Sequence, residues 1–283
     1  MAIQKVFVIG AGTMGNGIAQ VSAQAGYNVT MSDIQDEFIQ KGMATIEKSL
    51  DRQVKKETIT ESDKATIMSR IKTTLLMKDA KDADLVIEAA PEELELKKNI
   101  FKQLDNICKE DAILATNTSS LPVGAIADVT KRPERVVGIH FMNPVPVMKG
   151  VEVIRAEKTS DDVVEVSKEY VRSLGKEPCE VKDLAGFVVS RLVDVLMNEA
   201  IRCVMDGNKP EEIDKAMKYC CNFPMGPLEL CDLAGADVVL HGTETMYADF
   251  GERWKPAPLL ETMVKEGKLG RKTGKGFYDY TQK

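Results

Sequence analysis

The feature that most constrains the fold is a strand that leads directly into a glycine-rich turn and a helix. Residues 5–9 form an apolar, β-branched run, which predicts a buried strand. Residues 10–15 then read Gly-Ala-Gly-Thr-Met-Gly, and residues 16–25 have a helical pattern. Such glycines let the backbone approach a pyrophosphate, and the helix N-terminus supplies N–H groups for the phosphates. We therefore predict a dinucleotide-binding domain, with an unrelated glycine-rich turn as the alternative. The turn residues expected at the cofactor are Gly10, Gly12, Thr13, Met14 and Gly15.

A carboxylate at the end of the second predicted strand indicates which dinucleotide binds. This strand, residues 28–33, ends in Asp33, 23 residues after Gly10. An acid at this position binds the ribose hydroxyls of the adenosine. Its charge repels a 2′-phosphate, so the expected cofactor is NAD and not NADP.

Strand and helix patterns alternate along the first part of the chain. Apolar runs at residues 83–90 and 112–117 predict buried strands, and residues 92–108 between them predict a helix. This alternation predicts a doubly wound, Rossmann-like α/β sheet. We expect this domain over residues 1–183, with a helical hairpin insertion near residues 36–70.

Residues 184–283 are expected to form an all-helical domain. The run from Phe187 to Met205 is almost entirely apolar, which predicts a buried helix. Because too little chain follows to cover it, we expect a homodimer interface on this domain. The basic, glycine-rich segment 268–280 is predicted to fold back onto the cofactor or the partner subunit.

Residues 138–154 contain the strongest candidate for catalysis. His140, one of two histidines in the chain, is expected at the end of a strand, where parallel sheets place their ligands. A turn with two prolines follows, and a second apolar run carries Glu152. A carboxylate inside a strand is costly unless it is paired, and beside an imidazole it fixes the tautomer and raises basicity. We expect Glu152 to pair with His140; a structural histidine and a surface glutamate are the alternative.

Two other groups of residues have both a functional and a structural interpretation. Ser119 lies in the hydroxyl-rich segment 117–122, on the same rim of the sheet as His140, and its alternative role is to cap a helix. Arg52 and Lys56 lie one helical turn apart and can receive a polyanionic substrate tail. A solvated helix face is the alternative for this pair.

The composition excludes several classes of function. A net charge of −6 argues against general nucleic-acid binding, and no apolar run is long enough to cross a membrane. Two distant histidines and six cysteines without a Cys-x-x-Cys pair predict no metal site. Reduced cysteines and the lack of a basic, apolar leader predict a cytoplasmic protein.

Together, several of these segments resemble one family. The motifs at 10–15, 117–120, 140–148, 151–154 and 270–278 resemble the L-3-hydroxyacyl-CoA dehydrogenase family, and the resemblance extends almost end to end. It is closest to the bacterial 3-hydroxybutyryl-CoA dehydrogenases. The resemblance implies a Rossmann-like domain followed by a helical domain that forms a homodimer.

The resemblance also implies roles for individual residues. His140 is then the general acid–base, Glu152 orients it, and Ser119 binds the substrate hydroxyl or ketone. Ser190 stands where the family usually has asparagine near the substrate carbonyl, and its shorter side chain is expected to reach through a water. Other implied cofactor contacts are Ala90, Glu92, Lys97, Asn117, Asn143 and Lys272, and the implied substrate contacts are Ser49, Arg52, Lys56, Ser119 and Asn143.

The implied activity is NAD-dependent interconversion of (S)-3-hydroxyacyl-CoA and 3-oxoacyl-CoA. The expected pair is 3-hydroxybutyryl-CoA and acetoacetyl-CoA, in fatty acid or butyrate metabolism. One alternative is a β-hydroxyacid dehydrogenase acting on a free acid, which typically uses a lysine as acid–base. Another is a weakly active NAD-binding or sensory protein, or a structural subunit. Turnover of acetoacetyl-CoA compared with free acetoacetate separates these three possibilities.

Overall fold

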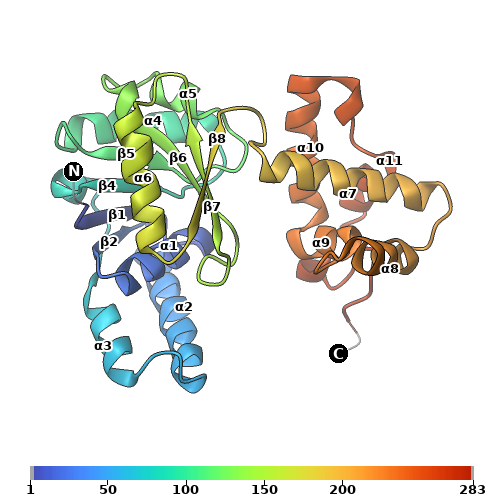
Figure 1. Ribbon diagram of the computed structural model, residues 1–283, viewed down its shortest axis with the longest axis horizontal. Helices are drawn as coiled ribbons and strands as arrows, with labels where there is room; N and C mark the ends of the chain where they lie inside the picture. Colours follow the sequence, from blue (N-terminus) through green and yellow to red (C-terminus); the bar gives the residue numbers. More distant parts are fainter. Residues whose placement is uncertain (1–2, 282–283) are drawn as a thin grey trace. The chain divides into compact units, whose positions relative to one another are not determined.

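The computed structural model describes residues 3–281, and the chain divides into two compact units between Asp183 and Leu184. The first unit is a sheet flanked by helices and the second consists mainly of helices, as Figure 1 shows. This architecture confirms the predicted fold class. Within residues 3–281, no helix is long and apolar enough to span a membrane.

The first unit is built on one eight-stranded sheet with the order β3-β2-β1-β4-β5-β6-β7-β8. Neighbouring strands are parallel except β6 and β7, which form an antiparallel pair. The chain order reverses between β1 and β4, and ligands of such sheets bind outside the carboxyl ends of the strands at this point. The strands are β1 (Lys5–Ile9), β2 (Asn28–Ser32), β3 (Ile71–Thr74), β4 (Leu85–Glu88), β5 (Ile113–Thr116), β6 (Val136–Phe141), β7 (Gly150–Arg155) and β8 (Glu177–Lys182).

Helices pack against the sheet and bury its central strands β4, β5 and β6 along their whole length. Side chains alternate between the faces along each strand. Val6 and Val8 of β1 belong to a core that also contains residues of α1 and α6, and the hydroxyls of Ser22 and Tyr170 join these two helices at 2.6 Å. The helices are α1 (Thr13–Gln24), α2 (Asp36–Lys55), α3 (Glu61–Ser69), α4 (Leu94–Ile107), α5 (Val123–Ala127) and α6 (Asp161–Ser173), with short 3-10 helices η1 (Met77–Asp82) and η2 (Pro133–Arg135).

The predicted hairpin insertion is formed by α2 and α3, which extend away from the sheet (Figure 1). Lys64 of α3 pairs with Asp51 at 2.5 Å and with Glu47 at 3.6 Å, both on α2. Thr60 caps α3 and forms a reciprocal capping box with Asp63. The hairpin is therefore stabilised by charge pairing and capping as well as by apolar contacts.

A glycine separates two consecutive helices of the second unit. Gly235 separates α9 from α10 and has a φ of +104°, which favours glycine. The helices are α7 (Val189–Met205), α8 (Pro210–Cys221), α9 (Pro227–Ala234), α10 (Ala236–Phe250) and α11 (Pro258–Lys265), with η3 (Glu252–Trp254) and η4 (Arg271–Thr273).

The helix predicted from Phe187 to Met205 begins two residues later than expected, and part of its surface is not covered by this unit. Phe187 has a φ of +50° and lies before α7, which begins at Val189. Met197 and Ile201 are buried, whereas Leu192 is 61% exposed. The reason is that α9, α10 and α11 contact α7 without enclosing the whole circumference of its first half.

The glycine-rich tail packs against α9 of its own unit. Asp232 accepts hydrogen bonds from the backbone N–H groups of Phe277 and Tyr278, each at 2.9 Å. A Cβ at Gly270 or Gly276 would lie within 2.3 Å of Asp232 atoms, so only glycine permits this contact. Contact of the tail with the cofactor or with a partner subunit stays a prediction.

One half-buried carboxyl of the second unit leads to a prediction about stability. Burial raises the pKa of Asp194 on α7 from 3.8 to about 7. The folded state therefore keeps a proton that the unfolded chain loses, and stability falls as the pH rises from about 4 to about 7. Asp194→Asn removes this titration. It should stabilise the unit at pH 8 by about 1–2 kcal/mol, and much less at pH 4.

Urea unfolding followed by tryptophan fluorescence measures this effect, because Trp254, the only tryptophan, is buried in the same unit. Asp206→Asn is the matched control, since Asp206 is the exposed C-cap residue of α7. An equal gain at both pH values would contradict a titration of Asp194.

Candidate active site

The glycine-rich turn lies at the carboxyl end of β1 and opens α1. A Cβ at Gly10, whose φ is +98°, would lie 2.6 Å from the carbonyl oxygen of Ala89. At Gly15 a Cβ would lie 1.8 Å from the carbonyl oxygen of Gly10. Beside Gly12, in contrast, the described residues leave open space. The turn is therefore closed towards the protein and accessible to a ligand at Gly12.

Groups suited to NAD surround this open position. The first-turn N–H groups of α1, at Thr13, Met14 and Gly15, have no carbonyl one turn earlier in the helix, and the helix dipole adds positive charge for phosphates. Asp33 accepts the N–H of Ala11 with Oδ2 at 2.7 Å, which holds its carboxylate beside the turn. The open space beside Gly12, the N-terminus of α1 and the carboxylate of Asp33 together fit a dinucleotide whose adenosine ribose carries no 2′-phosphate.

His140 and Glu152 lie opposite each other on the antiparallel pair β6–β7. Their side chains meet at 2.9 Å between Nδ1 and Oε2, and both residues are buried. Nδ1 is the ring nitrogen on the carboxylate side, which leaves Nε2 on the opposite edge of the imidazole. The structure therefore brings together the two residues that the sequence analysis selected as an acid–base pair.

The hydroxyl-rich loop does not cap α5, because the N-cap residue of α5 is Pro122 and makes no side-chain cap. Instead, the loop surrounds the carboxylate of Glu92. Oε1 of Glu92 accepts the hydroxyl of Thr118 at 2.6 Å and the N–H of Ser119 at 2.9 Å. The Ser119 hydroxyl lies 3.2 Å from the same oxygen. Both Ser120 donors also reach it.

A buried ion pair supports this loop, and the sequence analysis did not identify it. Lys97 is 1% exposed and donates to Glu88, which is fully buried, at 2.7 Å. The ammonium of Lys97 also lies 3.4 Å from Oε2 of Glu92. Burial alone would raise the pKa of the Glu92 carboxyl. Lys97 and the hydrogen bonds from Thr118 and Ser119 outweigh burial, so this pKa lies below its usual range.

Two asparagines lie near the end of β6. The side-chain oxygen of Asn117 accepts the N–H of Phe141 at 2.9 Å, which ties the hydroxyl-rich loop to the strand of His140. Asn143 is exposed in the turn that follows. Lys176, which the sequence analysis also missed, is buried and donates to the carbonyls of Val145 and Met148, each at 2.6 Å. A lysine thus fixes the turn that joins His140 to Glu152.

The basic residues selected for the substrate tail lie at the C-terminal end of α2. Arg52 and Lys56 are exposed, and Ser49 is half-buried on the preceding turn. The neighbouring carboxylate of Asp51 is paired with Lys64 of α3, and the exposed carboxylate of Glu57 follows Lys56 directly. This location also suits basic residues for a structural reason, because the helix C-terminus carries partial negative charge.

Two of the selected residues belong to the second unit. Ser190 is half-buried in the first turn of α7. Lys272 forms an ion pair with Asp237 at the start of α10. Their roles towards substrate and cofactor stay predictions.

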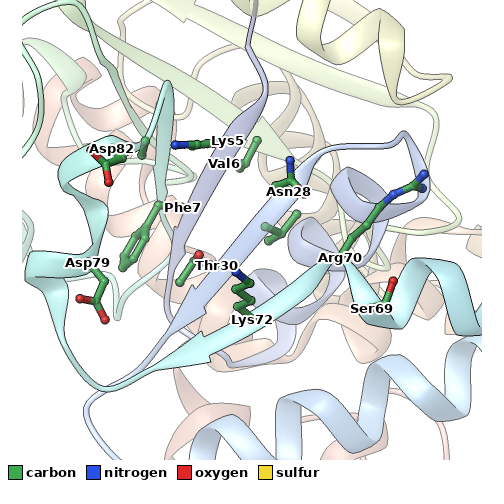
Figure 2. Close-up of a pocket in the computed structure, with 12 residues that line it drawn as sticks. Lys5, Val6, Phe7, Asn28, Thr30, Ser69, Arg70, Lys72, Asp79 and Asp82 are labelled. Carbon is green, nitrogen blue, oxygen red and sulfur yellow. The ribbon is translucent and has the colours of Figure 1, made fainter.

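A pocket of about 460 Å³ lies at the amino ends of the strands, opposite the rim that carries His140 (Figure 2). Lys5, Asn28 and Arg70 line it and lie at or just before the amino ends of β1, β2 and β3. Parallel sheets bind their ligands at the carboxyl ends. The rim that carries His140 is therefore the better candidate site.

Comparisons with known proteins agree with this geometry. The family model described as 3-hydroxyacyl-CoA dehydrogenase, NAD binding domain, matches residues 5–184. The model of the C-terminal domain of the same family matches residues 186–280. Together they account for nearly the whole chain.

Individual relatives cover the chain from end to end. A 3-hydroxybutyryl-CoA dehydrogenase from Clostridioides difficile is 46% identical over 280 residues, which are 98% of this chain and 100% of the relative. A probable 3-hydroxybutyryl-CoA dehydrogenase from Bacillus subtilis is also 46% identical and covers 100% of this chain and 99% of the relative. The crystal structure of (S)-3-hydroxybutyryl-CoA dehydrogenase from Ralstonia eutropha is 48% identical, with a TM-score of 0.96 over 99% of this chain and 100% of that one. The chain therefore belongs to the 3-hydroxyacyl-CoA dehydrogenase family.

Proposed function

We propose that the protein interconverts (S)-3-hydroxyacyl-CoA and 3-oxoacyl-CoA with NAD(H), and that 3-hydroxybutyryl-CoA and acetoacetyl-CoA are its substrate pair. The observation that carries the proposal is the His140–Glu152 pair on the rim of a dinucleotide-binding sheet. Full-length relatives named for this reaction support the choice of substrate.

His140 has the central role in the proposed mechanism. In the oxidation direction, Nε2 removes the proton of the substrate hydroxyl as the carbon–oxygen double bond forms. The carboxylate of Glu152 accepts a hydrogen bond from the N–H at Nδ1 and stabilises the resulting imidazolium. The carboxylate itself stays ionised. The Ser119 hydroxyl lies 3.2 Å from Glu92, and its hydrogen can instead be donated to the substrate oxygen, on which negative charge develops as Nε2 takes the hydroxyl proton.

The cofactor site supplies the other half of the reaction. Bound NAD⁺ would supply the acceptor for the hydride of the carbinol carbon. The N–H groups at Thr13 and Met14 would hold the pyrophosphate, and Asp33 would bind the adenosine ribose. With the pyrophosphate and the adenosine bound there, the substrate carbon that gives up the hydride would lie at the rim that carries His140.

An absorbance assay tests the proposal directly. The protein is mixed with NADH and acetoacetyl-CoA, or with NADH and free acetoacetate, and the loss of NADH is followed. Rapid loss with the thioester alone is the expected result. Preference for the free acid would point to a β-hydroxyacid dehydrogenase, and no loss with either substrate would refute the proposed activity.

We expect Lys56→Ala to raise KM for acetoacetyl-CoA, because Lys56 and Arg52 form an exposed positive cluster in an acidic protein. One lost charge pair at the surface is worth about 0.2–1 kcal/mol, which corresponds to an increase of up to about fivefold. The increase should be larger at low salt, where screening is weak. Lys102→Ala is the control, since Lys102 is an exposed lysine of α4. An unchanged KM at low salt would leave this cluster as a solvated helix face.

Replacing Ser190 with asparagine should increase kcat several-fold with little change in NADH affinity. The proposal places residue 190 near the substrate oxygen, where an asparagine amide reaches further than a serine hydroxyl. Removing one donor to a developing oxyanion can cost about 2.7–4 kcal/mol, and a bridging water would recover part of that loss. Ser190→Ala should be slower than the parent. If asparagine brings no gain and alanine no loss, residue 190 does not contact the reacting oxygen.

We also propose a homodimer formed through the second unit and a cytoplasmic location. The exposed apolar side chains of Leu184, Leu192 and Val238 support the dimer, since exposed apolar surface commonly marks an interface. Sedimentation velocity tests the assembly.

A further inference from the structure

The turn between β6 and β7, residues 142–149, has one buried side chain. Val145 is 2% exposed and belongs to the core of the first unit, whereas most of the residues around it in the turn are exposed. A pocket of about 390 Å³ lies between this turn, the end of α1 and residues 173–176. Apolar packing is therefore interrupted beside the turn, and the position of the turn depends on a few specific contacts.

Lys176 holds the turn from the side of β8. It is 8% exposed, and its ammonium donates to the carbonyls of Val145 and Met148, each at 2.6 Å. The next residue, Glu177, donates its N–H to the carbonyl of Lys149 at 2.9 Å, where the pairing of β7 with β8 begins. Burial lowers the pKa of Lys176, which shows that its charge is kept in the interior at a cost.

A second contact joins the turn to α1. A Cβ at Gly17 would lie 2.8 Å from the Cβ of Val145 and 3.1 Å from its Cγ2, and the first of these distances is shorter than side-chain atoms of this kind adopt. Gly17 lies inside the helix, where glycine is less stable than alanine. Its φ is not positive, so its backbone does not require glycine. The missing side chain instead permits the close approach of Val145.

Together the two contacts tie the acid–base pair to the helix expected to receive the cofactor. The turn joins His140 to Glu152, whose side chains meet at 2.9 Å. Gly17 lies in the first part of α1, two residues after Gly15 of the glycine-rich turn. A displacement of the β6–β7 turn would therefore alter the position of His140 relative to the groups that would hold the pyrophosphate.

We propose that Lys176 and Gly17 are positioning residues that hold the β6–β7 turn against α1 and so set the position of His140 relative to the cofactor. This role rests on the proposed dehydrogenase function. Neither residue is assigned a contact with substrate or cofactor. Both are unfavourable for stability where they lie, one as a buried charge and the other as a glycine within a helix, and both contact the same valine.

Two single variants test the contacts separately. Lys176→Met keeps the apolar stem of the side chain but removes the charge and the donors, and Gly17→Ala adds one methyl group against Val145. Residues 15–23 of α1 are all buried, so the exposed turn should move rather than the helix. A misplacement of about 1 Å can cost about 10²-fold in rate, and the paired strands limit the movement. We therefore expect kcat for acetoacetyl-CoA reduction to fall by about fivefold to fiftyfold in each variant.

Comparison of kcat with KM separates positioning from a loss of folded protein. The value of kcat is calculated per NADH-binding site, from the stoichiometry of a fluorescence titration, so that unfolded molecules are not counted. NADH affinity and KM for acetoacetyl-CoA should each change by less than about threefold, because the groups expected to bind these molecules are unaltered.

Lys158→Met is the matched control for the loss of a lysine. Lys158 is exposed just beyond β7 and pairs with Asp128 at 2.7 Å. Because exposed pairs of this kind contribute little, this variant should retain the parent's kcat.

A double-mutant cycle tests whether the two residues act through the same turn. Lys176 and Gly17 belong to different segments and share Val145 as a neighbour. Once either contact is lost, the turn is already displaced. The double variant should therefore have a kcat less than about threefold below that of the slower single variant. Two independent effects would multiply instead.

Three results would overturn the positioning role: a kcat per NADH-binding site within about twofold of the parent in either single variant, multiplied losses in the double variant, or weaker NADH binding at constant kcat. If Lys176→Met fails to fold, Lys176→Gln replaces it in the same cycle, with the same expected non-additivity, because glutamine keeps N–H donors on a shorter side chain.

The parent is assayed before its variants. An inactive parent refutes the proposed function, and the positioning role falls with it, whereas an active parent with equally active variants refutes the positioning role alone.

Discussion

Replacing His140 with glutamine is expected to lower kcat by about 10²–10⁴-fold, the usual contribution of a general acid–base group. Glutamine keeps a similar shape and can hydrogen-bond to Glu152, but it neither accepts nor releases a proton at neutral pH. NADH binding should survive, because the glycine-rich turn and Asp33 lie on β1, α1 and the end of β2, away from the β6–β7 pair. Reduction of acetoacetyl-CoA gives kcat, and a fluorescence titration gives the NADH dissociation constant.

The second histidine provides the control. His241 is exposed on α10 in the second unit, so His241→Gln should behave like the parent. If His140→Gln retains turnover within about tenfold of the parent, His140 is a structural residue and not the acid–base group. Loss of NADH binding in that variant would instead indicate damage to the sheet.

The sheet and the contact between His140 and Glu152 were predictable because both follow from short-range patterns. Continuous apolar runs predicted buried strands, as β1 and β4 are. The pairing of His140 with Glu152 followed from one turn between two apolar runs, since an antiparallel register places residues at matched distances from the turn opposite each other. Both patterns can be read from residues that lie close together in the sequence.

The supporting ion pair was not predictable in the same way. Lys97 lies three residues before Ile100 and four before Phe101, on the apolar face of α4, but this pattern does not indicate which carboxylate pairs with it. Its burial depends on Glu88, at the end of a strand that reads as entirely apolar until its last residue. A contact between a helix and a strand end depends on packing that periodicity does not encode.

The edge strand β8 was missed for a related reason. Its sequence, Glu177 to Lys182, carries polar and charged residues because it lies at the edge of the sheet. Glu180 pairs with Arg155 and Lys168, so its charges are satisfied across neighbouring elements. Only the pairing with β7 identifies this segment as a strand.

Replacing Glu152 with glutamine should lower kcat nearly as much as loss of the histidine, although Glu152 is not expected to contact the reacting atoms. The neutral amide cannot balance the charge of an imidazolium, and its NH₂ can donate to Nδ1 and so favour the wrong tautomer. In a serine-protease pair of the same kind, this change costs about 10⁴-fold. Because a buried imidazolium without its carboxylate is unfavourable, the loss in the reduction direction should be smaller at pH 6 than at pH 8.

Glu152 can either orient His140 or only stabilise the fold. The pH dependence of kcat, measured beside thermal unfolding of the same variant, distinguishes these two roles. Glu157→Gln is the control, since Glu157 is exposed just beyond β7 and should give the parent's profile. In the contrary case, the Glu152→Gln protein folds normally, reduces acetoacetyl-CoA at the parent's rate and keeps the parent's pH profile. That result would show that the carboxylate does not affect proton transfer by His140. The 2.9 Å contact would then be a structural hydrogen bond in the core of the β6–β7 pair, and the acid–base role would rest on His140 alone.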